Sequence, residues 1–220
     1  MTETNGNFGK KADACYDPAF AGRDVYENVN PKIAGLYAGE STVLDIGCGS
    51  GALGAWIKRE NPQAVVNGMD MSPEAGRAAT ERLDAFWCID LDLSPLPETS
   101  LKYDLIILGD ILEHLKRPDL FLTGMHDHLS PGGGVIVSVP NIANYSIRLR
   151  LLFGEFRYTE TGIMDRTHLR FFTWNTFAEL ISRCGFFVEK RTFISRFSGP
   201  LLRIFYPLLA VQFIVKLKRR

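Results

Sequence analysis

The residues with the clearest chemical meaning lie between positions 41 and 54, which read STVLDIGCGSGALG. An apolar run ends beside an acid, Asp45, and a glycine-rich turn follows it. Its glycines are Gly47, Gly49, Gly51 and Gly54. Glycine adopts a positive φ without steric cost, and because it lacks a Cβ it lets a ligand approach the backbone closely. The G-x-G-x-x-G pattern at 49–54 is found in nucleotide-binding loops, so we expect a nucleotide-type ligand here.

Two acids restrict the choice of ligand. A carboxylate at Asp45 would repel the pyrophosphate of a dinucleotide, whereas it suits a ligand with a cationic ammonium or sulfonium group. Asp70 ends the next apolar run, where a carboxylate accepts hydrogen bonds from both hydroxyls of a ribose. A nicotinamide oxidoreductase is the rival interpretation of the glycines, and Asp45 argues against it. The two acids together predict an adenosine ligand that carries positive charge.

Alternating strands and helices must position these residues. The expected strands lack clean polar alternation, as in strands covered on both faces, and span 42–47, 64–70, 85–90, 103–110, 134–141, 186–193 and 210–218. The expected helices span 24–37 with a break near Pro31, 52–60, 73–82, 117–129 with SPGGG closing it, and 174–184. The alternation predicts a doubly wound α/β fold with a seven-stranded, mostly parallel sheet.

Length and composition fit one domain. The chain has 220 residues, is 46% hydrophobic and has zero formal net charge. We expect a flexible segment at 1–23 and a single domain at 24–220, with an unusually long connection at 141–173. The four cysteines form no CxxC pair, and the histidines show no metalloprotease spacing, so no metal is expected. The first residues lack the layout of a signal peptide, which favours a cytoplasmic location.

Several motifs, in their order and spacing, carry a resemblance to a known family. VLDIGCGSG, Asp70, CIDLD, YDLIILGDILEHL and LSPGGGVIVSVPN resemble the motifs of class I S-adenosylmethionine-dependent methyltransferases. The resemblance covers about residues 24–195. It implies a Rossmann-like sheet whose last strand is antiparallel, S-adenosyl-L-methionine as cofactor and S-adenosyl-L-homocysteine as product.

The resemblance also implies residue roles on the cofactor side. Asp45 and the backbone at Gly47, Gly49 and Gly51 would hold the methionine end, and Asp70 would bind the ribose. The remaining cofactor contacts would be Met71 and Leu91 beside the adenine, Asp90 on its amino group, Gly109 near the methyl group, and Tyr26 over the cofactor. A solvated loop acid is the alternative for Asp90, and a surface or packing tyrosine is the alternative for Tyr26.

An oxygen acceptor needs a base, and three residues are the catalytic candidates. Asp110 would face the transferring methyl group at the end of the fourth strand, and His114 follows it by four residues, so both would share a face if this segment were helical. His168 is the second candidate base, and Asp165 could orient it. A packing role for His114, and an ion-pair network of Asp165 with Arg166 and Arg170, are the alternatives.

The segment 141–173 resembles the acceptor side of methyltransferases associated with bacterial cell-surface polysaccharide biosynthesis. Its expected substrate contacts are Arg148, Arg157, Tyr158, Asp165, Arg166 and Arg170. Guanidinium groups bind phosphate or carboxylate in a bidentate manner, which suggests a sugar or glycan precursor that carries anionic groups. Two alternatives stay open: a small-molecule methyltransferase directed at quinones or amines, and a non-catalytic S-adenosylmethionine-binding module.

The charge distribution and the end of the sequence bear on partners. Residues 1–140 carry an excess of acids and residues 141–220 an excess of bases, which is typical of an interaction surface or of neutral drift. No nucleic-acid reader motif accompanies the arginines, so nucleic acid is not the expected partner. The apolar stretch 197–220 is too short to span a bilayer. A lid followed by a buried strand is favoured over peripheral membrane contact.

Overall fold

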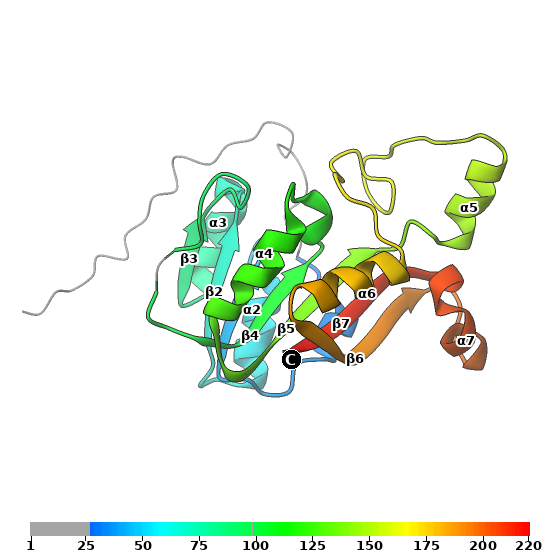
Figure 1. The fold of residues 1–220 in the computed structure, drawn as a ribbon. Coiled ribbons are helices and arrows are strands. Elements are labelled where there is room, and N and C mark those ends of the chain that lie inside the picture. Colours follow the sequence, from blue (N-terminus) through cyan, green and yellow to red (C-terminus); the bar gives the residue numbers. More distant parts are fainter. Residues whose placement is uncertain (1–26, 98) are drawn as a thin grey trace, which may run out of the picture.

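The computed structural model describes residues 27–97 and 99–220 (Figure 1). Tyr26 and the segment 1–23 therefore lie outside the described residues. No helix in the described ranges is long and apolar enough to cross a membrane.

Seven strands form one sheet, as predicted. They are β1 (Thr42–Ile46), β2 (Val65–Asp70), β3 (Ala85–Cys88), β4 (Tyr103–Gly109), β5 (Leu129–Pro140), β6 (Phe186–Ser195) and β7 (Ala210–Arg219). The order is β3-β2-β1-β4-β5-β7-β6, with parallel pairing from β3 through β5. β7 lies between β5 and β6 and is antiparallel to both, which confirms the expected last strand.

Helices cover both faces of the sheet (Figure 1). They are α1 (Pro31–Ala34), α2 (Ala52–Glu60), α3 (Pro73–Arg82), α4 (Pro118–Gly124), α5 (Tyr145–Leu152), α6 (Trp174–Arg183) and α7 (Pro200–Leu209). The predicted bounds of α2 and α3 are confirmed. The predicted helix at 24–37 is wrong within the described residues, since α1 begins at Pro31, where the Asn30 side chain accepts from the amides of the first turn.

The predicted helix at 117–129 is also wrong in extent. α4 passes into a short 3-10 helix, η3 (Met125–Asp127), and β5 begins at Leu129. The SPGGG run therefore lies inside β5, beside a register shift between Tyr103 and Leu105. A Cβ on Gly133 would lie 2.8 Å from the carbonyl oxygen of Tyr103, so close backbone approach explains the glycine.

Two apolar cores lie on opposite faces of the sheet. In β4, Leu105 and Ile107 belong to one core, whereas Ile106 and Leu108 belong to the other. All four side chains are buried. Coverage on both faces explains why the strands read as continuous apolar runs rather than as an alternation.

The stretch 197–220 forms α7 and then the interior strand β7. Phe213, Ile214 and Val215 are fully buried, which confirms the predicted buried final strand. The apolar side chains of Ile204 and Phe205 on α7 are exposed, at 69% and 48%. No residue from 197–199 or 204–220 lines the cavity described below, so these residues form no lid over it.

Candidate functional site

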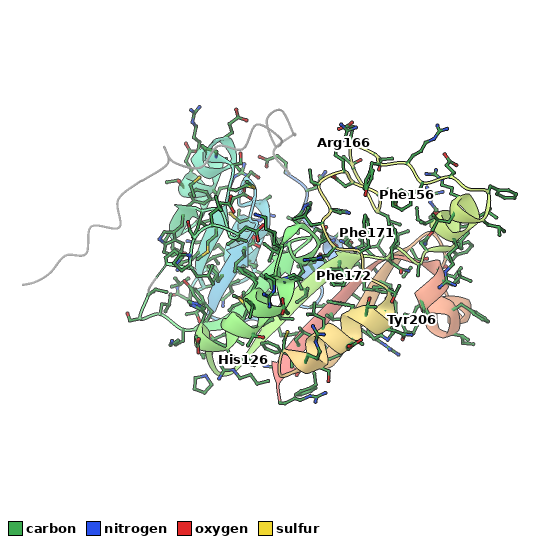
Figure 2. The ribbon with its side chains drawn as sticks, turned by 45° about the horizontal axis from the view of Figure 1, so that its top comes forward. His126, Phe156, Arg166, Phe171, Phe172 and Tyr206 are labelled. Atoms are coloured by element: carbon green, nitrogen blue, oxygen red, sulfur yellow. The ribbon has the colours of Figure 1, made fainter. Side chains whose placement is uncertain are left out.

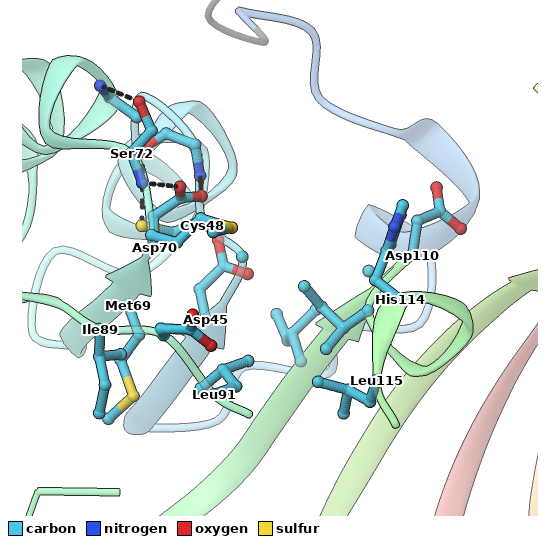
Figure 3. A pocket seen from close by; sticks show the side chains of 18 of the residues that line it. Asp45, Cys48, Met69, Asp70, Ser72, Ile89, Leu91, Asp110, His114 and Leu115 are labelled. Carbon is cyan, nitrogen blue, oxygen red and sulfur yellow. Dashed lines mark hydrogen bonds between the residues drawn. The ribbon is translucent and has the colours of Figure 1, made fainter. Parts of the chain in front are cut away.

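A cavity of about 760 Å³ opens at the carboxyl ends of β1, β2 and β4 (Figure 3). Ligands of doubly wound sheets bind at this edge. Ten residues expected from the sequence line it: Asp45, Gly47, Gly49, Asp70, Met71, Asp90, Leu91, Gly109, Asp110 and His114. Sequence reasoning missed lining residues on three other segments, namely Asn28, Asn30 and Ile33 before and in α1, Lys116 after the 3-10 helix η2 (Leu112–His114), and Thr167 and Leu169.

The glycine loop has the backbone conformation that the sequence predicts. Gly47, Gly49 and Gly51 have φ values of 77°, 53° and 77°. A Cβ on Gly47 would lie 2.3 Å from the Cδ1 atom of Ile111, which also lines the cavity. The amides of Gly47 and Cys48 both donate to the carbonyl of Met69, which holds the turn against β2.

Gly51 and Gly54 serve the packing of the loop. A Cβ on Gly51 would lie 3.2 Å from the Cα of Ala79 in α3, and Gly51 is not among the lining residues of the cavity. A Cβ on Gly54 would lie 2.3 Å from Leu83 and 3.0 Å from Val66. These glycines therefore let α2 approach α3 and β2 closely.

Two carboxylates, those of the buried Asp45 and the partly buried Asp70, line the cavity (Figure 3). Asp45 is only 4% exposed, and its burial, with the charge of Asp70 nearby, raises its pKa to about 7. Asp70 accepts from the amides of Gly49 at 2.9 Å and Ser72 at 2.8 Å, so it joins the glycine loop to the start of α3. Burial also raises the pKa of Asp70. Ligand-free, the site therefore concentrates negative charge that a cation would relieve.

The residues predicted for the adenine side follow β2 and β3. Asp90 and Leu91 line the cavity after β3, and Met71 lines it after β2. One carboxylate oxygen of Asp90 accepts from the amide of Asp92 at 2.9 Å. This bond orders the loop, while Asp90 remains part of the cavity wall.

The segment after β4 differs from the expectation. Asp110 has a φ of 55°, and the only helical residues that follow are the 3-10 helix η2 (Leu112–His114). The predicted shared helical face of Asp110 and His114 is therefore wrong. Asp110 is instead fixed to β5, because its carboxylate accepts from the Ser138 hydroxyl at 2.9 Å. His114 still reaches the cavity on the same side as Asp110 (Figure 3).

The two predicted histidines lie together although 53 residues separate them. The ring centroids of His114 and His168 are 4.8 Å apart, in an edge-on arrangement. Burial, followed by the charge of His168, lowers the pKa of His114. The carbonyl of Glu113 accepts from the amides of Leu169 at 2.8 Å and Arg170 at 2.9 Å, which ties this segment to η2.

Glu113 is the residue that sequence reasoning missed. Its side chain is fully buried, and neither carboxylate oxygen has a hydrogen-bond partner within the described structure. Burial raises the pKa of Glu113 well above its usual range, and the charges of Asp110 and Asp165 add to this. The signal was present in the sequence as the neighbour of His114, but its burial depends on the contact with 165–170.

The carboxylate of Asp165 faces its own turn. It accepts from the amide of Thr167 at 2.8 Å and from the Thr167 hydroxyl at 2.7 Å. The Nδ1 atom of His168 lies 3.1 Å from the carbonyl oxygen of Ile163. The orientation of His168 is thus assisted by a backbone carbonyl that the sequence did not indicate.

None of the six expected substrate contacts lines the cavity. Figure 2 shows Arg166 on the outer part of the loop, where it pairs with Glu160, while Phe172 lies below against α6. The other expected contacts are also engaged locally or exposed: Arg148 donates to the carbonyl of Ala143, Arg157 pairs with Glu155, and Tyr158 is 51% exposed. The arginines therefore do not form the convergent anion site that the sequence suggested.

Arg170 contributes to a second, smaller pocket. It donates to the carbonyl of Lys116 at 2.6 Å, and both residues line a pocket of about 320 Å³ between α4 and α6. Arg117 and Arg183 also line it, and they pair with Asp119 and Glu179 of the same pocket. Lys116 lines the main cavity as well as this smaller pocket.

Comparison with known proteins identifies the family. A methyltransferase domain family matches residues 22–190, which is most of the chain. The chain belongs to this methyltransferase domain family. The fold that the sequence resemblance implied is thereby confirmed.

Individual relatives of this methyltransferase domain match more weakly. Trans-aconitate 2-methyltransferase of Mycobacterium tuberculosis is 34% identical over 99 residues, which are 44% of this chain and 36% of that protein. The match spans little more than a third of that relative's length. An S-adenosylmethionine-dependent methyltransferase of Mesorhizobium loti has a similar structure, with a TM-score of 0.60 and 20% sequence identity. This match covers 86% of this chain and 96% of the Mesorhizobium loti chain. The plantazolicin methyltransferase BpumL in complex with SAH has a TM-score of 0.59 and 21% sequence identity. This match covers 82% of this chain and 77% of BpumL.

Proposed function

We propose that this methyltransferase domain binds S-adenosyl-L-methionine in the 760 Å³ cavity and transfers its methyl group to an oxygen of a small acceptor. The observation that carries the proposal is the buried Asp45 carboxylate beside a glycine loop in which Gly47 has a positive φ and a Cβ would meet the Ile111 side chain. A buried acid that faces a cavity suits a ligand with positive charge and disfavours a pyrophosphate.

The residues present fit this cofactor. Asp45 and the loop at Gly47 and Gly49 would hold the methionine end, and the carboxylate of Asp70 has acceptor capacity left for ribose hydroxyls beside its two amide bonds. Met71 and Leu91 would flank the adenine. When bound, the cofactor supplies an electrophilic methyl group on a sulfonium.

The chain itself contributes positioning and exclusion of water. Gly109 and Asp110 end β4 beside the cavity, and the Ser138 hydroxyl fixes Asp110 there. His114 and Thr167 line the cavity together, since Nδ1 of His114 lies 3.2 Å from the Thr167 carbonyl oxygen, and Leu169 lines it as well. An acceptor oxygen would therefore lie between Asp110 and the pair His114 and His168. There the activation barrier to methyl transfer is lowered mainly because the two reactants are held in the right orientation.

For the acceptor we propose a sugar or glycan precursor with anionic groups. Lys116, which lines the cavity, and Arg170, which donates to the Lys116 carbonyl beside it, support an anion near this side of the cavity. A small organic acid is the second candidate, favoured because several matched relatives are named for trans-aconitate. The association with polysaccharide biosynthesis stays a prediction.

We also propose that the protein is cytoplasmic and contacts the membrane surface through residues 197–220. The exposed apolar side chains of Phe197, Ile204 and Phe205 support it. Flotation with vesicles that contain anionic lipid, compared with a Phe205→Ser variant, tests this contact. An unchanged soluble fraction with wild-type protein would contradict it.

Calorimetric titration with S-adenosylhomocysteine and with NAD tests the cofactor. Stoichiometric binding of the former and none of the latter is expected. Mass spectrometry of sugar phosphates, nucleotide sugars and small polycarboxylates incubated with protein and methyl-labelled cofactor then tests the acceptor. Binding without any transfer across such a panel and in cell extracts would favour the non-catalytic module.

A further inference from the structure

Three potential metal ligands converge where the main cavity meets the acceptor-side segment. One atom each from Glu113, His114 and His168 lies within 4.8 Å of the others. Glu113 is buried and the two imidazoles are half-buried, so this is not a solvated surface cluster. We propose that these three residues bind a divalent transition-metal ion, and that the ion holds an oxygen of the methyl acceptor. The second half of this inference rests on the proposed methyltransferase function.

The carboxylate of Glu113 is the strongest observation. Its side chain is fully buried and both of its oxygens lack a hydrogen-bond partner among the described residues. Burying a carboxylate without compensation is unfavourable, and buried carboxylates are therefore paired or bound to metal ions. No other described side chain has a buried oxygen or nitrogen without a hydrogen-bond partner. A cation between Glu113 and the histidines would remove the penalty.

The backbone sets both imidazoles in the tautomer that a metal site needs. Nδ1 of His114 lies 3.2 Å from the carbonyl oxygen of Thr167, and Nδ1 of His168 lies 3.1 Å from that of Ile163. Because a carbonyl oxygen only accepts, each Nδ1 carries the proton and each Nε2 carries the lone pair. Metal-binding histidines commonly donate their other ring N–H to a carbonyl or carboxylate in this way.

The supporting contacts join the two segments that provide the ligands. Amides of Leu169 and Arg170 donate to the carbonyl of Glu113, and the Thr167 hydroxyl bonds the buried Asp165 at 2.7 Å. The ligand positions are therefore held by hydrogen bonds on both sides rather than by loop ends alone. Ligands about 2.1 Å from a tetrahedral ion are about 3.4 Å apart, so binding requires the most widely separated ligand atoms to close in by up to about 1.4 Å.

The ligand set indicates the class of ion. Two imidazoles and one carboxylate suit Zn²⁺, Fe²⁺ or a similar transition metal, whereas Mg²⁺ and Ca²⁺ prefer oxygen ligands alone. Three protein ligands leave coordination positions open for another molecule. His114 lines the cavity beside Asp110, so an open position there would receive an acceptor hydroxyl or carboxylate oxygen. The ion would orient that oxygen and lower the pKa of a hydroxyl.

The test uses Co²⁺ as a spectroscopic probe on the full chain. Metal-free wild-type protein is titrated with Co²⁺, and the visible absorption bands of the ion are followed. We expect one Co²⁺ per chain, displaced by Zn²⁺, with affinity at least about tenfold lower in His114→Ala, His168→Ala and Glu113→Gln. His128→Ala, which lies outside the cluster, is the matched control and should bind as the wild type does.

Glu113→Gln separates the metal site from a purely structural acid. Glutamine keeps the shape and neutrality of a protonated Glu113, so a structural role predicts unchanged folding and unchanged Co²⁺ binding. X-ray absorption of the Zn²⁺-loaded wild type should show two imidazoles and no sulfur, which needs no variant to fold. Absence of stoichiometric Co²⁺ binding, sulfur in the first coordination sphere, or full binding in both histidine variants would overturn the proposal. Binding of S-adenosylhomocysteine by the same samples tests the cofactor proposal independently.

Discussion

The affinity for S-adenosylhomocysteine should depend on pH through Asp45. In the ligand-free protein, burial and the charge of Asp70 raise the pKa of Asp45 to about 7. A ligand ammonium beside this carboxylate favours its ionised form, so the pKa falls on binding. Binding below pH 7 therefore requires Asp45 to lose a proton, and affinity should increase as the pH rises toward 7.

The magnitude follows from proton linkage. When one proton is released per ligand, the association constant changes by about tenfold per pH unit, or about 1.4 kcal/mol. The rise should level off above a pH of about 7, where Asp45 is already ionised. The stability of the ligand-free chain changes with pH in the opposite direction. A pKa raised from 3.8 to about 7 means that the folded state holds the extra proton, so stability falls as the pH rises between these values.

Isothermal titration calorimetry between pH 5.5 and 8.5 measures the first effect, and two buffers of different ionisation enthalpy give the number of protons released. Asp45→Asn should bind about 10- to 100-fold more weakly at pH 8, since it loses a charge-assisted hydrogen bond. Its affinity should also be nearly independent of pH. Asp70→Asn is the control for the second acid, because burial raises its pKa too. A flat wild-type profile, or an unchanged slope in Asp45→Asn, would refute the reasoning.

Two further substitutions test the fold that holds the site. Gly47→Ala should abolish binding of S-adenosylhomocysteine and destabilise the chain by about 1–3 kcal/mol, because its Cβ would meet Ile111 at 2.3 Å in a left-handed conformation. Gly132 has the same φ of 77° but no neighbour near a Cβ, so Gly132→Ala measures the cost of the backbone conformation alone. Equal losses of stability in both variants would contradict the steric argument. Phe213→Ala in β7 should cost about 3–5 kcal/mol by chemical denaturation, because this side chain is fully buried. The half-exposed Phe205→Ala should cost less than about 0.5 kcal/mol, and a similar loss in the two would show that β7 does not anchor the sheet.

Local patterns predicted the sheet and the cofactor side of the cavity well. The glycine loop, Asp45 and Asp70 lie at strand ends, and the ends of parallel strands meet at one edge, so their sequence positions determine their proximity. The helices α2 and α3 were predicted at their observed bounds, and in the structure the Ser72 side chain caps α3. In these segments the residues that form the sequence pattern are also the residues that contact one another in the fold.

The acceptor side was predicted less well because its geometry depends on distant contacts. Glu113 reads as a surface acid until residues 165–170 cover it. Arg148 and Arg166 read as anion ligands, but their guanidinium groups bind Ala143 and Glu160 nearby. Charge composition shows that such groups are present, whereas their direction depends on the loop backbone, for which the sequence has no periodic signal.

The placement of β7 has a consequence for the order in which the sheet forms. β6 precedes β7 in the chain, yet its only partner in the sheet is β7, which also completes β5. At a synthesis rate of about 5–20 residues per second, β5 therefore presents an unpaired apolar edge for roughly one to five seconds after β6 has been made. During that interval the nascent chain has its cofactor-side strands in place but an edge open to wrong pairing. Chaperone dependence during synthesis should therefore be governed by the interval between β6 and β7, and a longer α7 connection should increase it.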